Sequence, residues 1–434
     1  MAILLSAVIG PAHARGFIRD AEIEATLRLI AQPVLTAAGL NAGSVRIVIV
    51  NDPSLNAFVG AGQTIFLHTG LLTRLKSVEM IQAVIAHEAA HIRAGHAITR
   101  GDAARNSSST LALGMLLAAM AASGGQGEAA GVIAAGSISA AERGFLAHSR
   151  AEESAADQAS VRILALAGVP PTAALDTLNL FSGQDVLTDK RRDPYTRTHP
   201  LNSQRISSLR TAIATVRFNG PRQNKALPYW HARMVAKFEG FLRKPGRLLK
   251  RAKQQKNTEL AAYMRAIAYH RKSDLTRAHR EMDSLIRARP NDPYYAELKG
   301  QFFLESGRAK DAVTYYRRAL SLAPKEPQIQ AGLARALLAL ETGAGNREAV
   351  GLLEKSRQRD LADPRTLQFL ALAYARTGKT GQASLATAER FALSGRIKDA
   401  AVHARRAMGT LPEGTPSWRR ANDIVILARR AQGK

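Results

Sequence analysis

A short apolar segment, Val84–Ile92 (VIAHEAAHI), carries an HExxH motif and constrains this chain more than any other feature. Residues four apart share one face of a helix, so His87 and His91 can direct ring nitrogens at one metal ion, with Glu88 beside them. The apolar flanks predict a buried helix, where unpaired imidazoles are costly and a metal ion satisfies them. The alternative is a helix with two polar residues near its surface. We predict a zinc site of the peptidase type, with one Zn²⁺ per chain.

A third metal ligand is expected from a second helix. A catalytic zinc ion takes three protein ligands and a water molecule, so a carboxylate must come from elsewhere in the chain. The segment 150–157 (RAEESAAD) places Glu153 and Asp157 on one helical face. Glu153 can then bind the metal while Asp157 accepts a hydrogen bond from a ligand imidazole. Glu152 is the rival ligand, although it has no acid four residues further on, and a solvated acidic face is the remaining alternative.

Two further histidines lie close to these motifs in the sequence. His199 follows the polar, irregular segment 182–197 and precedes a predicted helix. On a loop that returns to the site, His199 could be a fourth metal ligand at rest or could stabilise the oxyanion during turnover. The alternative is a surface histidine. His96 lies five residues beyond His91, off the ligand face, and is predicted to be structural.

The N-terminal part predicts a helix followed by short strands. Residues 20–38 have apolar side chains at helical spacing, and Gly39 ends the run. Residues 45–50 (VRIVIV) predict a strand, and residues 56–67 predict a loop or short strand followed by a second strand. In peptidases of this general kind, an edge strand lies over the metal and pairs with the substrate backbone. We assign this role to the second strand, formed by Thr64, Ile65, Phe66 and Leu67. A plain core strand is the alternative.

Residues 1–14 have the features of a secretory signal peptide that is truncated at its start. An apolar run is followed by Ala12-His13-Ala14, a small-x-small cleavage site, but no basic residue precedes the run. An ordinary N-terminal helix is the alternative. Zero cysteines exclude disulfides and thiolate ligands. The other long apolar stretch, 111–122, is shorter than the ~20 residues of a spanning helix, so we expect a soluble periplasmic protein.

The net charge is +26, from 61 basic and 35 acidic residues. No nucleic-acid motif accompanies this charge, so we expect no nucleic-acid partner. An exported chain instead meets anionic lipids and acidic clients. Residues 243–256 hold seven basic residues and no acid, which predicts either a helix on an anionic membrane surface or a solvated linker helix. Residues 106–140 predict two alanine-rich helices that act as a lid, touch membrane or simply pack together.

From residue 257 onward the chain shows a repeat of about 34 residues with the tetratricopeptide signature. Successive copies begin near 257, 293, 327 and 364, and a compressed unit ends the chain. Stacked helix pairs of this kind leave a concave groove for a segment of another protein. We therefore predict a mainly α protein, with an α+β zincin-type catalytic domain and a small sheet (15–218), a basic linker (219–256) and an all-α tetratricopeptide solenoid (257–434).

Five ordered motifs together resemble a known family: NAF (56–58), GLL (70–72), HEAAH followed by GH, RxEESAAD (150–157) and THPxxxxRI (198–206). They resemble the gluzincin family that includes HtpX and the prenyl-protein peptidases, most closely its BepA-like periplasmic branch, which adds tetratricopeptide repeats. The resemblance implies zinc bound by His87, His91 and Glu153, with Glu88 as general base and Asp157 in the second shell. It also implies that His199 occupies the fourth zinc position in a latent state.

The motifs and the resemblance together predict a function. The expected protein is a periplasmic zinc endopeptidase for misfolded or misassembled envelope and outer-membrane proteins, in which Glu88 activates a zinc-bound water. Its expected partners are polypeptides, by analogy outer-membrane proteins or their assembly machinery, bound in the repeat groove. The alternative is a tetratricopeptide chaperone or adaptor for outer-membrane proteins whose metal site is latent.

Overall fold

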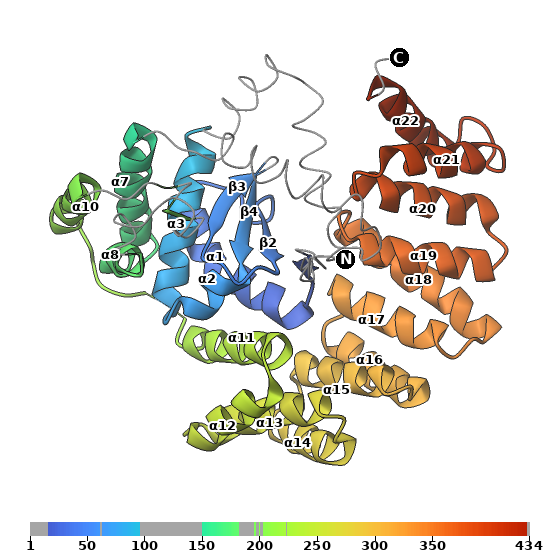
Figure 1. Ribbon diagram of the computed structural model, residues 1–434, viewed down its shortest axis with the longest axis horizontal. Coiled ribbons are helices and arrows are strands. Elements are labelled where there is room, and N and C mark those ends of the chain that lie inside the picture. The colour runs from blue at the N-terminus through green and yellow to red at the C-terminus, as the bar shows by residue number, and fades with distance from the viewer. Residues whose placement is uncertain are drawn as a thin grey trace, which may run out of the picture.

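The computed structural model describes residues 16–60, 63–95, 150–181, 195–196, 199, 203–222 and 224–431. The predicted signal peptide, the alanine-rich segment 106–140 and His96 lie outside these ranges. A small α+β unit is followed by a long helical solenoid that curves around it (Figure 1). The mainly α fold class expected from the sequence is confirmed.

A four-stranded sheet forms the centre of the α+β unit. Its strands are β1 (Phe17–Ile18), β2 (Arg46–Val50), β3 (Ala57–Gly60) and β4 (Thr64–His68), in the spatial order β1-β2-β4-β3. Strand β4 is parallel to β2 and antiparallel to β3. The prediction that residues 64–67 form an edge strand is therefore wrong. Residues 57–60 form a strand that covers the free side of β4, all five residues of β4 are buried, and β3 lies at the edge.

The helices of this unit within the described residues are α1 (Ala21–Ala37), α2 (Thr69–Arg74), α3 (Val78–Arg93), α7 (Arg150–Leu166), α8 (Thr172–Asn179) and α10 (Ser203–Thr215). The motif helix α3 begins where the Ser77 side chain accepts a hydrogen bond from the Met80 backbone N–H. It packs against α1, α7, α8 and β3, so most of its residues are buried. The HExxH motif consequently lies in the core of the unit.

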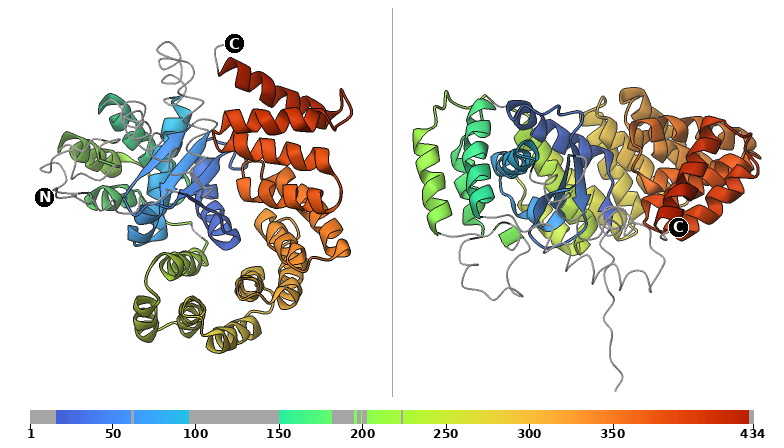
Figure 2. Two further views of the ribbon diagram at one scale, coloured as in Figure 1. Left: turned by 45° about the vertical axis from the view of Figure 1, so that its right-hand side comes forward. Right: turned by 90° about the horizontal axis from the view of Figure 1, so that it is seen from above.

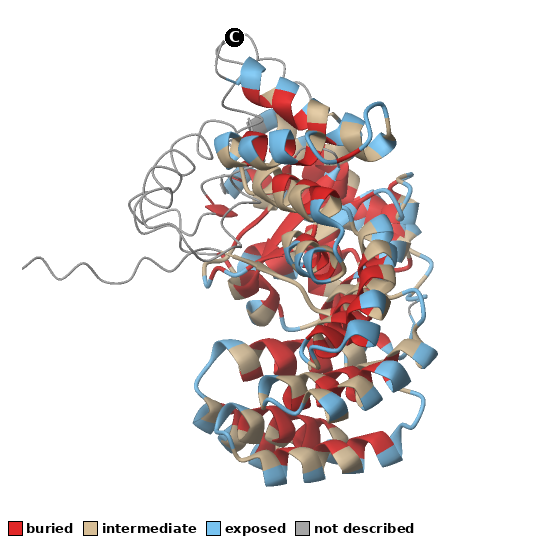
Figure 3. Ribbon diagram, turned by 90° about the vertical axis from the view of Figure 1, so that its right-hand side faces the viewer, coloured by how far each residue is buried: buried red, intermediate tan, exposed pale blue. Residues whose placement is uncertain are grey.

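The solenoid consists of helices in consecutive antiparallel pairs (Figure 2). Helices α11 (Leu227–Leu242) and α12 (Pro245–Gln254) precede the tetratricopeptide repeats, whose helices are α13 (Thr258–Arg271), α14 (Leu275–Ala288), α15 (Pro293–Glu305), α16 (Ala309–Leu322), α17 (Pro327–Leu338), α18 (Gly343–Arg359), α19 (Pro364–Arg376), α20 (Thr380–Leu393), α21 (Ile397–Met408) and α22 (Pro416–Arg430). Buried residues line the faces where neighbouring helices meet (Figure 3).

Small residues in the repeats have a direct steric reason. The ring of Tyr316 is buried between helices α15 and α17. A Cβ atom on Gly300 would lie 2.9 Å from this ring, and one on Gly332 would lie 2.4 Å from it. Neither position accepts a side chain without a shift of the tyrosine. The sequence spacing of small and aromatic residues thus reflects how adjacent repeats pack.

Helix α1 of the α+β unit packs into the concave side of the solenoid. Ala21 forms an apolar cluster with Ala296, Ala319 and Ile329 of the repeats. On the same side, the buried Glu22 carboxylate lies 2.6 Å from Nε of Arg233 and accepts a hydrogen bond of 2.7 Å from the Tyr263 hydroxyl.

Further ion pairs extend this junction between the α+β unit and the solenoid. Lys237 Nζ lies 2.7 Å from Asp20 and 3.3 Å from Glu22. At the outer margin, Arg28 donates a hydrogen bond of 2.8 Å to Glu326. Buried ion pairs are costly unless both partners are in place, so these contacts specify one orientation of the two parts. Part of the groove expected to hold other proteins is therefore filled by this chain's own α1.

None of the helices within the described residues combines the length and the apolar character needed to cross a membrane.

Candidate metal centre

Four side chains converge beside helix α3. His87 and His91 come from α3, Glu153 comes from the first turn of α7, and His199 comes from the loop before α10. Each offers one donor atom, and these atoms all lie within 4.8 Å of one another. All four side chains are buried. Among the described residues, this is the one such cluster of potential metal ligands.

The spacing of the donor atoms fits a tetrahedral cation site. Zinc bonds to nitrogen and oxygen of about 2.0–2.1 Å place two tetrahedral ligands roughly 3.3 Å apart. Here Nε2 of His87 and Nε2 of His91 lie 3.1 Å apart. The Glu153 carboxylate lies 3.3 Å from His91 Nε2 and 3.4 Å from His87 Nε2. Three donors of the types that zinc prefers therefore face a common point.

Glu88 lies next to this cluster without a hydrogen-bond partner. It is fully buried, and neither carboxylate oxygen accepts a hydrogen bond within the described part of the chain. Nε2 of His199 lies 3.6 Å from it. Burial raises the pKa of Glu88 although the neighbouring histidines oppose this shift. A buried carboxylate with free oxygens and a raised pKa suits an acid–base role.

In edge strand β3, the backbone groups of two residues point to the free edge of the sheet. The Asn56 carbonyl accepts a hydrogen bond of 3.0 Å from the His68 N–H, which fixes the register of the β3–β4 pair. Backbone groups alternate in antiparallel pairs, so those of Ala57 and Val59 point away from β4, along the free edge. Backbone groups at such an edge can pair with an added strand when no other group occupies them.

His199 joins this edge strand to the carboxylate ligand. Its Nδ1 atom lies 2.9 Å from Glu153, and its Nε2 atom lies 3.3 Å from the Ala57 carbonyl oxygen. The ring packs against Tyr195, with centroids 4.6 Å apart, and Tyr195 stacks on Phe181. The loop histidine thus lies between the Glu153 carboxylate and the backbone of the edge strand.

Asp157 and Arg205 surround the ligands with hydrogen bonds. Asp157 Oδ1 lies 3.0 Å from Nδ1 of His87, which fixes the orientation of that imidazole. Arg205 contacts both oxygens of Asp157, lies 2.9 Å from Glu153 and donates to the His199 carbonyl at 3.2 Å. We did not assign Arg205 a role from the sequence. Its only signal was the arginine of the THPxxxxRI motif.

The charges of these groups follow from their contacts. Burial alone would raise the pKa of Asp157, but hydrogen bonds from Arg205 and His87 hold it below its ordinary value. The pKa of Glu153 is likewise lowered despite burial, chiefly by the charge of His199. Burial lowers the pKa of His91 to about 3, which leaves a neutral imidazole. Glu152, the rival metal ligand in the sequence analysis, is not among the four side chains whose donor atoms converge.

The fold and the site define a class of protein. A buried helix with two convergent histidines, a carboxylate from a second helix and an adjacent glutamate fit the centre of a metallopeptidase. Residues 19–213 match the model of Peptidase family M48. This segment is therefore an M48 peptidase domain, and the chain is a metallopeptidase with tetratricopeptide repeats.

Curated relatives cover most of this chain. The beta-barrel assembly-enhancing protease of Yersinia pestis is 25% identical over 399 residues, which span 87% of this chain and 80% of the relative. The protein of the same name from Escherichia coli K12 is 26% identical over 359 residues, which span 81% of this chain and 72% of the relative. The resemblance inferred from the five motifs is confirmed. Yeast Tom70 aligns with 84% of this chain and 89% of its own, at 11% identity, but its TM-score of 0.33 is too low for structural conclusions.

Proposed function

We propose that this chain is a periplasmic zinc endopeptidase that acts on misfolded or misassembled outer-membrane proteins. The observation that carries the proposal is the convergence of His87, His91 and Glu153 on one point beside the Glu88 carboxylate, whose oxygens accept no hydrogen bond from the described residues. We further propose the boundaries 15–218 for the catalytic domain, 219–256 for the linker and 257–434 for the repeat domain.

His87, His91 and Glu153 are the proposed ligands of one Zn²⁺. When bound, the ion polarises a substrate carbonyl and lowers the pKa of a water molecule. Asp157 and Arg205 hold the ligand side chains in place through the hydrogen bonds described above. The nitrogen and carboxylate donors suit zinc, and their spacing supports a tetrahedral site.

Glu88 is the proposed general base and acid. Its oxygens are free of hydrogen bonds, so they can accept a proton from the attacking water and deliver it to the leaving amine. An extended substrate would add to β3 through the outward backbone groups of Ala57 and Val59. His199 occupies the Ala57 carbonyl in this structure, so it must move before a substrate pairs there. We propose that His199 blocks the resting site and that its movement frees the edge.

The client and the compartment rest on separate support. The relatives are named for enhancing β-barrel assembly, which favours clients among outer-membrane β-barrel proteins. The signal-like segment 1–14 favours export to the periplasm.

Replacement of Glu88 tests the enzymatic proposal. The Glu88→Gln variant should retain one equivalent of zinc but lose cleavage of casein by at least roughly a hundredfold, because the base is removed while the ligands remain. The matched control is Glu79→Gln, which changes a half-buried glutamate in the first turn of the same helix. Undiminished casein cleavage by the Glu88→Gln variant would contradict the proposal.

An adaptor function is the second candidate, favoured by the position of His199 in the site. A protein with a latent centre would hold outer-membrane clients through its repeats and cleave them rarely. The His199→Ala variant separates the two functions, because the protease proposal predicts faster casein cleavage when the edge strand is freed. If neither His199→Ala nor Glu88→Gln changes proteolysis while both variants still bind clients, the adaptor function is the better description.

A further inference from the structure

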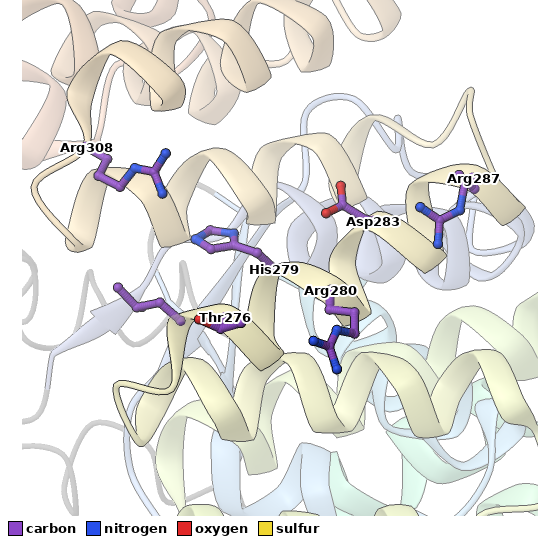
Figure 4. Close-up of a pocket in the computed structure, with 7 residues that line it drawn as sticks. Thr276, His279, Arg280, Asp283, Arg287 and Arg308 are labelled. Atoms are coloured by element: carbon purple, nitrogen blue, oxygen red, sulfur yellow. The ribbon is translucent and has the colours of Figure 1, made fainter.

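A recess lies between helices α14 and α16, outside the metal centre. It encloses about 460 Å³ and is lined by Leu275, Thr276, His279, Arg280, Asp283, Arg287 and Arg308. Figure 4 shows the labelled side chains of α14 in sequence along this helix, with Arg308 facing His279 from the start of α16. Thr276, Arg280, Asp283 and Arg287 follow one another at three or four positions, and Leu275 and His279 lie next to this row, so all of them are on one side of α14.

The recess has an excess of positive charge. Its one acidic residue, Asp283, is paired with the buried Lys299. Arg308 forms an ion pair with Asp311 at a distance of 2.8 Å. Arg280 and Arg287 form no ion pair with any described residue, and both are exposed. Two guanidinium groups are therefore free to bind an anion at this surface.

His279 lines the recess beside these arginines and has unsatisfied ring nitrogens. Its ring stacks on Phe303, with centroids 4.0 Å apart. Both ring nitrogens are inaccessible to solvent and lack a hydrogen-bond partner among the described residues. Burial, together with the charges of Lys299 and Arg308, lowers the pKa of this histidine, so it is neutral at pH 7 and has one N–H to donate. Unsatisfied buried polar atoms are rare unless a ligand or water completes them.

The surface next to the recess is also basic. Helices α12 and α14 both pack against α13. The segment 243–256, which contains α12, has seven basic residues and no acid, and all seven are exposed. Only Arg251 in this segment forms an ion pair with a described residue, Glu239. A negatively charged ligand or surface would thus be attracted to this end of the solenoid.

We propose that this recess binds a phosphate group, carried by a lipid headgroup or free in solution. Guanidinium groups form paired hydrogen bonds with phosphate oxygens, and a phosphomonoester carries more than one negative charge at neutral pH. The two exposed guanidinium groups match such a group better than they match a single carboxylate. Neither the metal centre nor the concave groove takes part in this binding.

Two probes test the proposal on the full-length protein. Inorganic phosphate is titrated by calorimetry. Vesicles of phosphatidylcholine with phosphatidic acid, a phosphomonoester, are compared in flotation with phosphatidylglycerol vesicles of equal surface charge. The Arg280→Gln/Arg287→Gln variant should bind the phosphatidic acid vesicles roughly thirtyfold less tightly than the native protein.

Two control variants separate a binding site from general attraction. Lys398→Gln/Arg405→Gln removes the same charge from exposed positions of α21 and should leave vesicle binding nearly unchanged. Arg280→Lys/Arg287→Lys keeps the charge but removes the planar donors, so it should lose the preference for phosphatidic acid while still binding both vesicle types. Circular dichroism checks that each variant is folded.

Loss of both phosphate and vesicle binding in the Arg280→Gln/Arg287→Gln variant supports a site open to either source. Loss of vesicle binding alone, when the native protein does not bind inorganic phosphate, supports a headgroup site. Equal binding of both vesicle types that is unaffected by this variant would overturn the proposal. Tighter binding of polyglutamate than of either phosphate probe by the native protein, lost in the Arg280→Gln/Arg287→Gln variant, would also overturn the proposal. The ligand would then be an acidic peptide.

Discussion

Arg205 and Asp157 form a buried bidentate ion pair, in which Nε and Nη2 of the guanidinium contact the two carboxylate oxygens at 2.5 and 2.9 Å. The same Asp157 orients His87, and the same Arg205 contacts Glu153 and the carbonyl of His199. One cation therefore connects helix α7 to the loop that carries His199.

Replacement of Arg205 should loosen the metal centre. The Arg205→Met variant leaves Asp157 and Glu153 without their cationic partner, so zinc affinity should fall by about 10- to 100-fold. Competition with a chelator measures this affinity. Arg210→Met, on the exposed side of the same helix, is the matched control and should bind zinc like the native protein. Equal zinc affinity in both variants would show that Arg205 does not position the ligands.

Proline substitutions in β3 test which strand receives the substrate. The backbone N–H of Val59 points to the free edge, so Val59→Pro removes a donor from the substrate without removing a bond to β4. We expect kcat/KM for an unfolded protein substrate to fall by about tenfold or more, with zinc content unchanged. Phe58→Pro, which removes an inward N–H, should instead destabilise the fold. Normal peptidase kinetics in Val59→Pro would exclude pairing at β3.

The buried ion pairs at the junction should contribute strongly to stability. Glu22→Ala leaves Arg233 and Lys237 partly unpaired in the interior and should lower the free energy of unfolding by about 3–5 kcal/mol. Asp399→Ala, which removes the solvent-exposed partner of Arg396 in α21, should cost about 1 kcal/mol or less. Urea unfolding of both variants measures the difference. Equal losses would mean that the junction contributes no more than a surface pair.

Glu326 should make the stability of the protein depend on pH. Burial raises the pKa of Glu326 from 4.5 to about 7, although Arg28 opposes the shift. Between these two pH values the folded state binds a proton that the unfolded state does not, so stability falls as pH rises from 4.5 to 7. Glu326→Gln should therefore change little at pH 5 and raise the free energy of unfolding by up to about 3 kcal/mol at pH 8.

Unfolding at pH 5 and pH 8 measures this effect. Glu348→Gln is the control, because Glu348 pairs with Arg317 on a more exposed surface. It should give small and equal changes at both pH values. A Glu326→Gln variant that is stabilised equally at pH 5 and pH 8 would contradict the assigned pKa.

Local spacing in the sequence predicted what a single helix determines. His87 and His91 share a face because they are four residues apart, and the same spacing places Glu153 and Asp157 together on α7. The repeat pattern similarly predicted helix pairs, because each pair is a local unit.

Features that depend on distant contacts could not be predicted. The edge of the sheet depends on which strands pair, and the short segment 57–60 gave too little pattern to show that it covers β4. Arg205 contacts a carboxylate 48 residues away, and Arg233 contacts Glu22 across more than 200 residues. Neither pairing leaves a local periodic signal in the sequence.

Anomalous diffraction at the zinc edge, from crystals of the Glu88→Gln variant grown with zinc, tests the central claim most directly. We predict one strong peak, within about 2.0–2.2 Å of Nε2 of His87, Nε2 of His91 and a carboxylate oxygen of Glu153. A peak coordinated by Glu152 in place of Glu153, or no peak between the two helices, would contradict the proposed centre.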